Sequence, residues 1–412
     1  MLLEFRLRNF RSFSQESVLS FAASGDTELL ETNTAATEIR ALPRAVRSAV
    51  IYGANASGKS NLIRAIQLMR GVVLESVSLK PDQLYNVQPF RLQEELKSEP
   101  TLFEVTIILE RLRYQYGFEF TPQRIVGEWL LVYRNPKPQQ WFDRRLNAED
   151  GKETFEFSTH LTGQKRTWQE ATRPNALFLS TAVQLNSEQL KPLYAWFAEA
   201  LIVLMDGGHL LPNISTDMIQ TSRGEAAIRS ILSAADIAIS GIRAVPKKGF
   251  RQQFRFDLAT GKSETQFEEG EFLVPEFRHA AGSVSADFAF EDESQGTQKL
   301  FALAGPLLDI IENGKILVID ELDRSLHPLL VRQIIKTFQD PVLNARGAQL
   351  FFSTHDTSLL DHSLLRRDQI WLTEKRRDQS SELLPLTEFS PRKGEALERG
   401  YLGGRYGGVP IL

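Results

Sequence analysis

The 412-residue sequence contains no cysteine. This excludes a disulfide framework, a thiolate nucleophile and a cysteine-rich zinc site. No uninterrupted apolar run approaches the ~20 residues that a membrane-spanning helix needs. Residues 1–8 alternate apolar and charged side chains, unlike the apolar core of a secretory signal. These absences favour a cytoplasmic protein with no membrane contact.

The sequence also lacks a repeat of fixed period, a low-complexity tract and a sustained heptad pattern. We therefore expect no long coiled coil, which needs at least three or four successive heptads. A formal net charge of -4 argues against a protein that wraps nucleic acid with its whole surface, although it leaves local basic patches open. The length and an ordinary apolar fraction of 42% allow two or three lobes with a sizeable core.

The periodicity of apolar residues predicts a mixed α/β chain. Residues 1–8 and 17–21 are expected to form a hairpin, with the first strand continuing to residue 13, whereas residues 24–47 are polar and irregular. Three runs predict an antiparallel meander, and two shorter runs extend it: 103–109, 114–120, 125–133, 141–142 and 155–157.

The later part of the chain changes character twice. Helices are expected over 187–200 and 224–240, and strand-like alternation returns in 244–290. From Ser294 onward the order becomes helix, strand, helix, strand. We therefore divide the chain into an N-terminal lobe over 1–80, a strand-rich and helical insert over 81–290, and a C-terminal lobe over 291–412.

A glycine-rich loop is the clearest chemical signal. The stretch "GANASGKS" at residues 53–60 satisfies the pattern G-x-x-x-x-G-K-[ST], between a strand-like run and a helical one. Such a loop lets backbone N–H groups converge on an anion, and the following helix directs the positive end of its dipole toward the same point. Lys59 then supplies a cation for the β and γ phosphates, and the Ser60 hydroxyl a ligand for Mg²⁺. A tight turn with an incidental lysine is the alternative.

These considerations predict a site for ATP and Mg²⁺. We assign cofactor binding in the loop to Gly53, Asn55, Ala56, Ser57, Gly58, Lys59, Ser60 and Asn61.

Four aliphatic residues followed by two acids, Asp320 and Glu321, predict a buried strand that delivers carboxylates at its C-terminal edge. Asp320 would assist the metal, and Glu321 would deprotonate the attacking water as the catalytic base. A strand that ends in solvated acids is the alternative. The phosphate loop in the same chain favours the catalytic interpretation.

Two further features are weaker signals. His355 follows the next buried strand, where an imidazole can hydrogen-bond the γ-phosphate, although a lone histidine is more often a satisfied core residue. Ser294 and Gly296 precede an apolar helix, and such residues form either an anion-binding helix N-terminus or an ordinary helix cap.

Taken in order, residues 53–60, 294–297, Asp320-Glu321 and His355 resemble the Walker A, signature, Walker B and switch-histidine elements of ABC-type ATPases. The segments "RNFRSF" and "DELDRSLHP" look like the soluble SMC and RecF branch. More narrowly, "SQGTQKLF", "FFSTHD" and the tail "YLGGRYGGVPIL" resemble the RloA-like, AAA-family ATPases of bacterial antiphage and abortive-infection systems.

This resemblance implies an SMC/RecF-like ATPase head that forms a homodimer by sandwiching ATP, with higher oligomers left open. It casts His355 as a γ-phosphate switch with a catalytic role, and Ser294 and Gly296 as residues that contact the ATP of the opposite subunit. Gln88 in "NVQPF" is the best candidate for the metal-binding glutamine of such ATPases, or else a surface residue before Pro89.

The chain departs from the transporter pattern at two places. In the signature, Gln295 stands at the first glycine and Thr297 at the final glutamine. After the acidic pair, Arg324-Ser325-Leu326-His327 stands where the transporter segment ends in Asp, which suggests a different communication between sites. The long insert between Ser60 and Ser294 disfavours a transporter subunit.

The leading functional hypothesis is a dimeric ATP-dependent switch of an antiphage system that controls a separate effector, expected to be a nuclease. No second cluster of acids or histidines suggests a nuclease site within this sequence. The alternative is a RecF-like repair ATPase that clamps DNA. Arg366-Arg367 and Lys375-Arg376-Arg377 are the basic stretches that would contact phosphates, although such runs are usually solvated faces.

Overall fold

A computed structural model describes seven segments of the chain. They are residues 1–134, 137–205, 211–233, 237–257, 262–324, 326–392 and 394–409. In 249–257 and 262–269 only the backbone is described.

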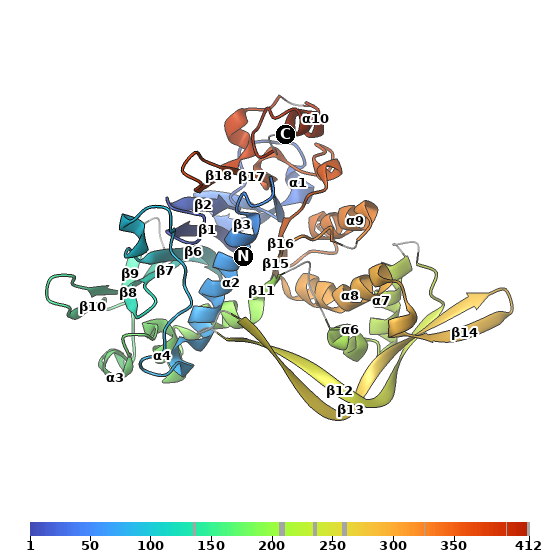
Figure 1. Cartoon of the computed structure of the whole chain (residues 1–412), viewed down its shortest axis with the longest axis horizontal. Coiled ribbons are helices and arrows are strands. Elements are labelled where there is room, and N and C mark those ends of the chain that lie inside the picture. Colours follow the sequence, from blue (N-terminus) through green and yellow to red (C-terminus); the bar gives the residue numbers. More distant parts are fainter. Residues whose placement is uncertain are drawn as a thin grey trace.

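A six-stranded sheet forms the centre of the molecule (Figure 1). Its order is β11 (Leu201–Leu204), β15 (Ile316–Ile319), β16 (Gln349–Ser353), β5 (Ser48–Gly53), β17 (Ile370–Lys375) and β18 (Ser381–Pro385). All strands run parallel except β18, which pairs antiparallel with β17. Every residue of β5, β15 and β16 is buried, as expected for parallel strands covered on both faces. Their carboxyl ends meet at one edge of the sheet.

A seven-stranded antiparallel sheet lies beside the central sheet (Figure 1). Its order is β10 (Glu153–Phe157), β9 (Gln139–Leu146), β8 (Ile125–Tyr133), β7 (Leu112–Phe120), β6 (Thr101–Leu109), β1 (Leu2–Arg8) and β2 (Ser17–Ser20). Strand β1 pairs with both β2 and β6, so the N-terminal hairpin and the meander form one continuous sheet.

Helix α2 (Lys59–Glu75) packs between the two sheets. Its apolar residues share one core with both sheets, including Ile51 of β5 and Phe103 of β6. The opposite face of the central sheet packs against α8 (Gln295–Asn313) and α9 (Pro328–Gln339) in a second core. The strands therefore alternate their side chains between two cores: Ile51 faces the first, and Val50 and Tyr52 face the second.

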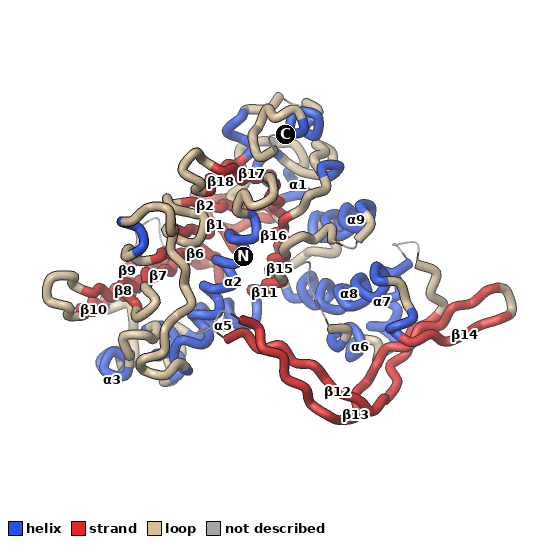
Figure 2. The backbone as a smooth tube through the Cα atoms, in the orientation of Figure 1, coloured by secondary structure: helices blue, strands red, loops and turns tan. Residues whose placement is uncertain are grey.

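The remaining elements surround these layers (Figure 2). A long ribbon of β12 (Gly241–Asp257), β13 (Lys262–Ala281) and β14 (Val284–Ala289) extends along one side. Strands β3 (Thr34–Ile39) and β4 (Leu42–Val46) form a small hairpin. The short helices are α1 (Leu30–Asn33), α3 (Lys165–Ala171), α4 (Phe178–Gln184), α5 (Lys191–Ala195), α6 (Asn213–Met218), α7 (Ser222–Ser233) and α10 (Leu397–Leu402).

Several predicted elements are confirmed. The N-terminal hairpin, the five-stranded antiparallel meander and the alternation of helix and strand after Ser294 all form. Among the described residues, the longest helix has 19 residues, and no helix is part of a long coiled coil.

Other local predictions are wrong. The first strand does not continue to residue 13, because Asn9 and Arg11 adopt φ values of 52° and 51° and turn the chain. Residues 24–47 are not irregular, since they contain α1, β3 and β4. The helix expected over 187–200 is confined to α5 and the π-helix at Trp196–Ala200. The helix expected over 224–240 starts earlier and ends at Ser233, and residues 234–236 lie outside the described part.

Candidate functional site

The glycine-rich loop connects β5 to α2, and its two fixed glycines are sterically required. Gly53 has φ of 156° and Gly58 has φ of 123°, a region that favours glycine. A Cβ on Gly53 would lie 2.3 Å from Thr373 Oγ1, and one on Gly58 would lie 2.5 Å from Ser381 Oγ. Ala56 between them also has a positive φ, 63°. The backbone is thus curved tightly at the N-terminus of α2.

Neighbouring strands brace this loop through small hydroxyl side chains. The Ser57 and Thr373 hydroxyls lie 2.6 Å apart, and Ser381 donates a hydrogen bond to the Ser57 carbonyl. Asn61 at the start of α2 donates to Ser12 Oγ at 2.9 Å. Sequence reasoning missed the roles of Ser12, Thr373 and Ser381. The sheet order, in which β17 lies beside β5 and β18 beside β17, brings Thr373 and Ser381 to the loop, and Ser12 reaches it from the turn after β1.

Lys59 is the buried cation of the loop. Its side chain is 7% exposed, and Nζ donates to the carbonyl oxygens of Gly53 at 2.7 Å and Ala54 at 3.2 Å. Burial lowers the pKa of Lys59, and the negative charges of nearby carboxylates act in the opposite direction. Those carboxylates belong to Asp320, Glu321 and Asp323. The structure therefore brings the loop lysine and the acids that follow β15 into one electrostatic neighbourhood.

Ser353 at the end of β16 connects the two predicted acids. Its hydroxyl donates to Asp320 Oδ1 at 2.6 Å and accepts a hydrogen bond from the Glu321 backbone N–H at 2.7 Å. Asp320 is only 3% exposed, whereas Glu321 is partly exposed. One buried hydroxyl thus fixes Asp320 toward the interior and the Glu321 backbone at the carboxyl edge of the sheet.

Glu321 adopts a left-handed backbone conformation, with φ of 52°. For a residue other than glycine this conformation costs about 1–3 kcal/mol and is concentrated at functional sites. The following turn is closed by the Arg324 N–H, which donates to the Glu321 carbonyl at 3.0 Å. Arg324 Nη1 also lies 3.7 Å from Glu321 Oε2. Ser325, the next residue, lies outside the described part of the chain.

His355 lies just beyond β16, beside this turn. Its side chain is exposed, and its backbone N–H donates to Asp323 Oδ2 at 3.3 Å. It is therefore not a core histidine. The other oxygen of Asp323, Oδ1, is buried without a hydrogen-bond partner among the described residues. His355 and Glu321 thus follow neighbouring strands, β16 and β15, at the same sheet edge.

Ser294 forms the N-cap of α8. It is exposed, and its Oγ accepts a hydrogen bond from the Thr297 N–H at 3.1 Å. Gly296 lies in the first turn of the helix and is partly exposed. The cap geometry agrees with the plainer of the two sequence interpretations. It also leaves the Ser294 position accessible to a second molecule.

Gln88 lines a pocket of about 410 Å³ that adjoins the loop through Asn61. The pocket is lined by Arg11, Ser12, Asn61, Gln88, Pro89, Phe90, Arg91, Leu92, Lys375 and Gln379. Three of these residues are cations and none is acidic. The Gln88 backbone carbonyl accepts a hydrogen bond from the Arg11 N–H at 2.7 Å. The pocket is therefore suited to an anionic ligand that extends from the loop.

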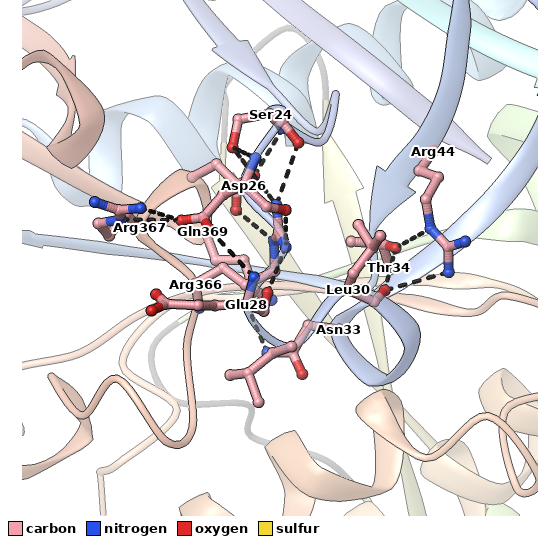
Figure 3. Close-up of polar contacts among 12 residues, drawn as sticks. Ser24, Asp26, Glu28, Leu30, Asn33, Thr34, Arg44, Arg366, Arg367 and Gln369 are labelled. Carbon is pink, nitrogen blue, oxygen red and sulfur yellow. Dashed lines mark hydrogen bonds and ion pairs between the residues drawn. The ribbon is translucent and has the colours of Figure 1, made fainter. Parts of the chain in front are cut away.

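Arg366 and Arg367 are parts of a structural network (Figure 3). Arg366 is 2% exposed, and its guanidinium bonds both oxygens of Asp368 and the backbone carbonyls of Asp26 and Glu28. Arg367 pairs with the Asp26 carboxylate. The sequence suggested that Arg366 either lies on a solvated face or contacts phosphate. Because Arg366 is buried and bonded within the protein, it does neither. These arginines hold residues 24–28 against the segment 366–368.

The family described as "AAA domain, putative AbiEii toxin, Type IV TA system" matches residues 48–361, most of the chain. The chain belongs to this AAA family. The match runs from β5 through the phosphate loop and the acidic pair to the residues just beyond His355.

Among solved structures, an SMC head domain from Thermotoga maritima is 14% identical, with a TM-score of 0.40, and covers 93% of this chain and 98% of its own. An SMC head bound to the C-terminal winged-helix domain of ScpA is also 14% identical, with a TM-score of 0.42. That match covers 93% of this chain and 96% of the SMC head. No curated protein matches the sequence.

The predicted α/β fold class is confirmed, and no long coiled coil forms among the described residues. That this fold is the ABC-type, SMC-like ATPase head stays a prediction. Family membership supports nucleotide binding and ATPase activity in general terms. In the part of the chain that the structure describes, no helix has the length and apolar character needed to span a bilayer.

Proposed function

We propose that this AAA-family chain is an ATP-binding and ATP-hydrolysing dimeric switch of a bacterial antiphage system. The observation that carries the ATPase proposal is the junction at Ser353. This hydroxyl holds both Asp320 and the backbone of Glu321 at the sheet edge, where their charges act on Lys59 of the phosphate loop.

The loop geometry fits a nucleotide triphosphate. The curved backbone from Gly53 to Gly58 and the N-terminus of α2 supply N–H donors for phosphate oxygens. In this proposal Lys59 turns from the loop carbonyls to the β and γ phosphates, and the cationic pocket beside Asn61 takes the remainder of the nucleotide. Loop residues 55–58 and Asn61 complete this cradle.

Ser60, Asp320 and Gln88 are the residues proposed to hold Mg²⁺, directly or through water. When bound, Mg²⁺ would neutralise charge on the transferring phosphoryl group. Glu321 would accept a proton from the attacking water, and exposed His355 would hydrogen-bond the γ-phosphate. The strained backbone of Glu321 supports its role, since strain is retained where it orients a functional group.

The homodimer is proposed from the exposed position of Ser294 and the partly exposed position of Gly296 at the N-terminus of α8. There, a second subunit would present its nucleotide to them across a two-fold interface. An assembly larger than a dimer is compatible with this proposal.

The defence role rests on a different kind of support. The family description names a putative AbiEii toxin of a type IV toxin–antitoxin system, and the sequence motifs resemble RloA-like antiphage ATPases. We propose that the switch controls a separate effector, expected to be a nuclease. Phage plating on hosts that carry the wild-type or the Glu321→Gln chain at its native locus tests this step, because equal plating would contradict it.

The decisive test of the ATPase proposal is Glu321→Gln. This variant should bind Mg-ATP like the wild type but hydrolyse it ~10²–10⁴-fold more slowly, because an amide cannot act as a general base. It should also accumulate as an ATP-bound dimer, which light scattering detects. The matched control is Glu312→Gln, on the outer part of α8, which should keep wild-type turnover. Normal turnover in Glu321→Gln would move the base elsewhere, with His355 the next candidate.

A DNA clamp, the alternative from the sequence, receives less support. Arg366 is buried, Arg367 is paired with Asp26, and Arg376 is paired with Glu382. Strong binding to naked DNA that falls steeply with salt would nevertheless favour the clamp over the switch.

A further inference from the structure

Lys299 connects the N-terminal part of α8 to the turn that follows the acidic pair. It lies five residues after Ser294, and its Nζ donates a hydrogen bond to the backbone carbonyl of Arg324. Arg324 in turn closes the turn onto the Glu321 carbonyl. One side chain therefore spans from the helix that begins at Ser294 to the backbone that carries Glu321.

Lys299 is partly buried, and its contact with Arg324 is a hydrogen bond to a backbone carbonyl and not an ion pair. Burial is the main influence on Lys299 and lowers its pKa to about 8. The charges of Asp323 and Glu321 raise it, and the charge of Arg324 lowers it. A lysine in this position loses hydration and is held among the charged groups of the turn.

The elements on both sides of Lys299 are rigidly packed. Leu300 and Phe301 of α8 lie in the same apolar core as Leu322, within the turn, and Leu326, just after it. The Glu321 backbone is held on its other side by Ser353. A small displacement of α8 would therefore reach the turn through the Lys299 contact and not be absorbed by loose packing.

We propose that Lys299 is a positioning residue that links α8 to the 321–324 turn and so sets the direction of the Glu321 carboxylate. This proposal rests on the proposed ATPase function. It adds a specific path by which a molecule bound at the N-terminus of α8 influences water activation within the same subunit. Lys299 itself contacts neither substrate nor reacting water in this scheme.

The test measures steady-state ATP hydrolysis by wild type, Lys299→Met and Lys299→Arg. Methionine keeps an unbranched apolar stem but removes the donor, so kcat should fall about 10- to 100-fold while KM and the ATP-induced rise in melting temperature stay unchanged. Arginine keeps a donor and a charge and should restore most of kcat. A purely structural role would instead lower the melting temperature and leave kcat per folded molecule unaltered.

The matched control is Lys315→Met. Lys315 is also partly buried and pairs with Asp309 at 2.7 Å, but at the far end of α8. It should keep wild-type kcat. If Lys299→Met melts below the assay temperature, Lys299→Leu, which also lacks a donor, replaces it and should show the same fall in kcat.

The outcomes separate this inference from the function on which it rests. If wild type hydrolyses ATP and Glu321→Gln does not, an unchanged kcat in Lys299→Met overturns the inference alone. A raised KM with unchanged kcat also overturns it, because Lys299 would then act in binding. Absence of hydrolysis by wild type would overturn the proposed function itself.

Discussion

Small hydroxyl side chains shape the candidate site as much as its charged groups do. Ser353 holds Asp320 and the Glu321 backbone, while Thr373 and Ser381 leave no room for a Cβ on Gly53 or Gly58. Each hydroxyl can both donate and accept a hydrogen bond. Serine and threonine can therefore connect two backbone segments without adding charge to a site that must bind an anion.

Lys59 of the loop is expected to be necessary for nucleotide binding. A ligand that binds only the folded state raises the melting temperature, by an amount equivalent to about 2.7 kcal/mol when its concentration is 100 times Kd. Lys59→Ala should abolish the rise that Mg-ATP gives in the wild type, because it removes the cation for the β and γ phosphates. Differential scanning fluorimetry with and without Mg-ATP measures this directly.

The control for Lys59→Ala is Lys336→Ala, which removes an exposed lysine near the end of α9 and should keep the full ATP-induced rise. Lys59 also bonds two loop carbonyls, so its loss can change the melting temperature without nucleotide. Only the difference between the two conditions bears on binding. An equal rise in Lys59→Ala would contradict the assignment of the phosphate loop.

The individual site residues differed in how well the sequence revealed them. Lys59 and Asp320 were identified from the sequence because the motif and the strand pattern that mark them lie within short stretches. Lys299, Ser353 and Thr373 were not, since their roles depend on which strands and helices become neighbours. The same reason explains Arg366, a charged residue whose burial depends on a carboxylate two residues away and on carbonyls more than 300 residues away.

At the element scale, the connections between helices and strands depend on a few partly buried ion pairs. Arg332 of α9 donates to Asp361 Oδ2 at 2.6 Å and to the Ser358 carbonyl at 2.9 Å. Burial alone would raise the pKa of Asp361, but hydrogen bonds from Arg332 and Ser363, with the charge of Arg332, hold that pKa at about 2. The pair attaches α9 to the segment that follows His355.

This pair predicts a pH-dependent contribution to stability. The folded pKa of Asp361 is below its ordinary value of 3.8, so the contribution is complete above about pH 4 and is lost as pH falls toward 2. Arg332→Met should lower the free energy of unfolding by about 1–2 kcal/mol at pH 7, a value reduced for the partial exposure of both side chains. Urea unfolding followed by tryptophan fluorescence measures the difference at each pH.

The control for Arg332→Met is Arg166→Met, which breaks the exposed Arg166–Glu170 pair and should change stability little. The difference between wild type and Arg332→Met should shrink between pH 4 and pH 2.5. A difference that stays constant across that range would assign the effect to packing of the arginine stem and not to the ion pair.

Elements were predictable where one periodicity dominated. Strands β6 to β8 are runs rich in β-branched and aromatic residues with short links between them, and β15 and β16 are short apolar runs with clear ends. Strand β11 was missed, because its four residues gain their partner β15 from more than 100 residues away. The turn after β1 was also missed, since positive φ at Asn9 and Arg11 depends on tertiary hydrogen bonds such as that from Phe90 to Asn9.

At the scale of the whole molecule, the chain is organised around two cores on opposite faces of one sheet. Helix α2 and the antiparallel sheet cover one face, and α8 and α9 cover the other. The phosphate loop begins α2, while Ser294 begins α8, so the two motifs belong to different layers. Sequence order alone supplied both motifs, but not whether they serve the same nucleotide or two different ones. The division at residues 80 and 290 also stays a prediction.

The roles of Ser294 and Lys59 can be tested by asking whether both act on the same nucleotide. Ser294→Arg should place a bulky cation at the exposed N-terminus of α8 and block closure of a dimer, without disturbing that subunit's own Lys59 loop. The variant should bind ATP but fail to dimerise. Lys59→Ala should fail for a different reason, because it cannot hold the phosphates. Each protein alone should therefore lack ATPase activity.

Mixing the two inactive proteins separates the interpretations of Ser294. In a mixed dimer, one composite site carries both defects and the other carries neither, so up to about a quarter of wild-type turnover should return at equal mixing. Fluorescence energy transfer between labelled subunits would establish independently that the subunits exchange. Activity restored only in the mixture requires Ser294 and Lys59 to act on the same nucleotide from opposite subunits. If the mixture stays inactive while exchange is observed, Ser294 is a helix cap, and any dimer must close through a different surface.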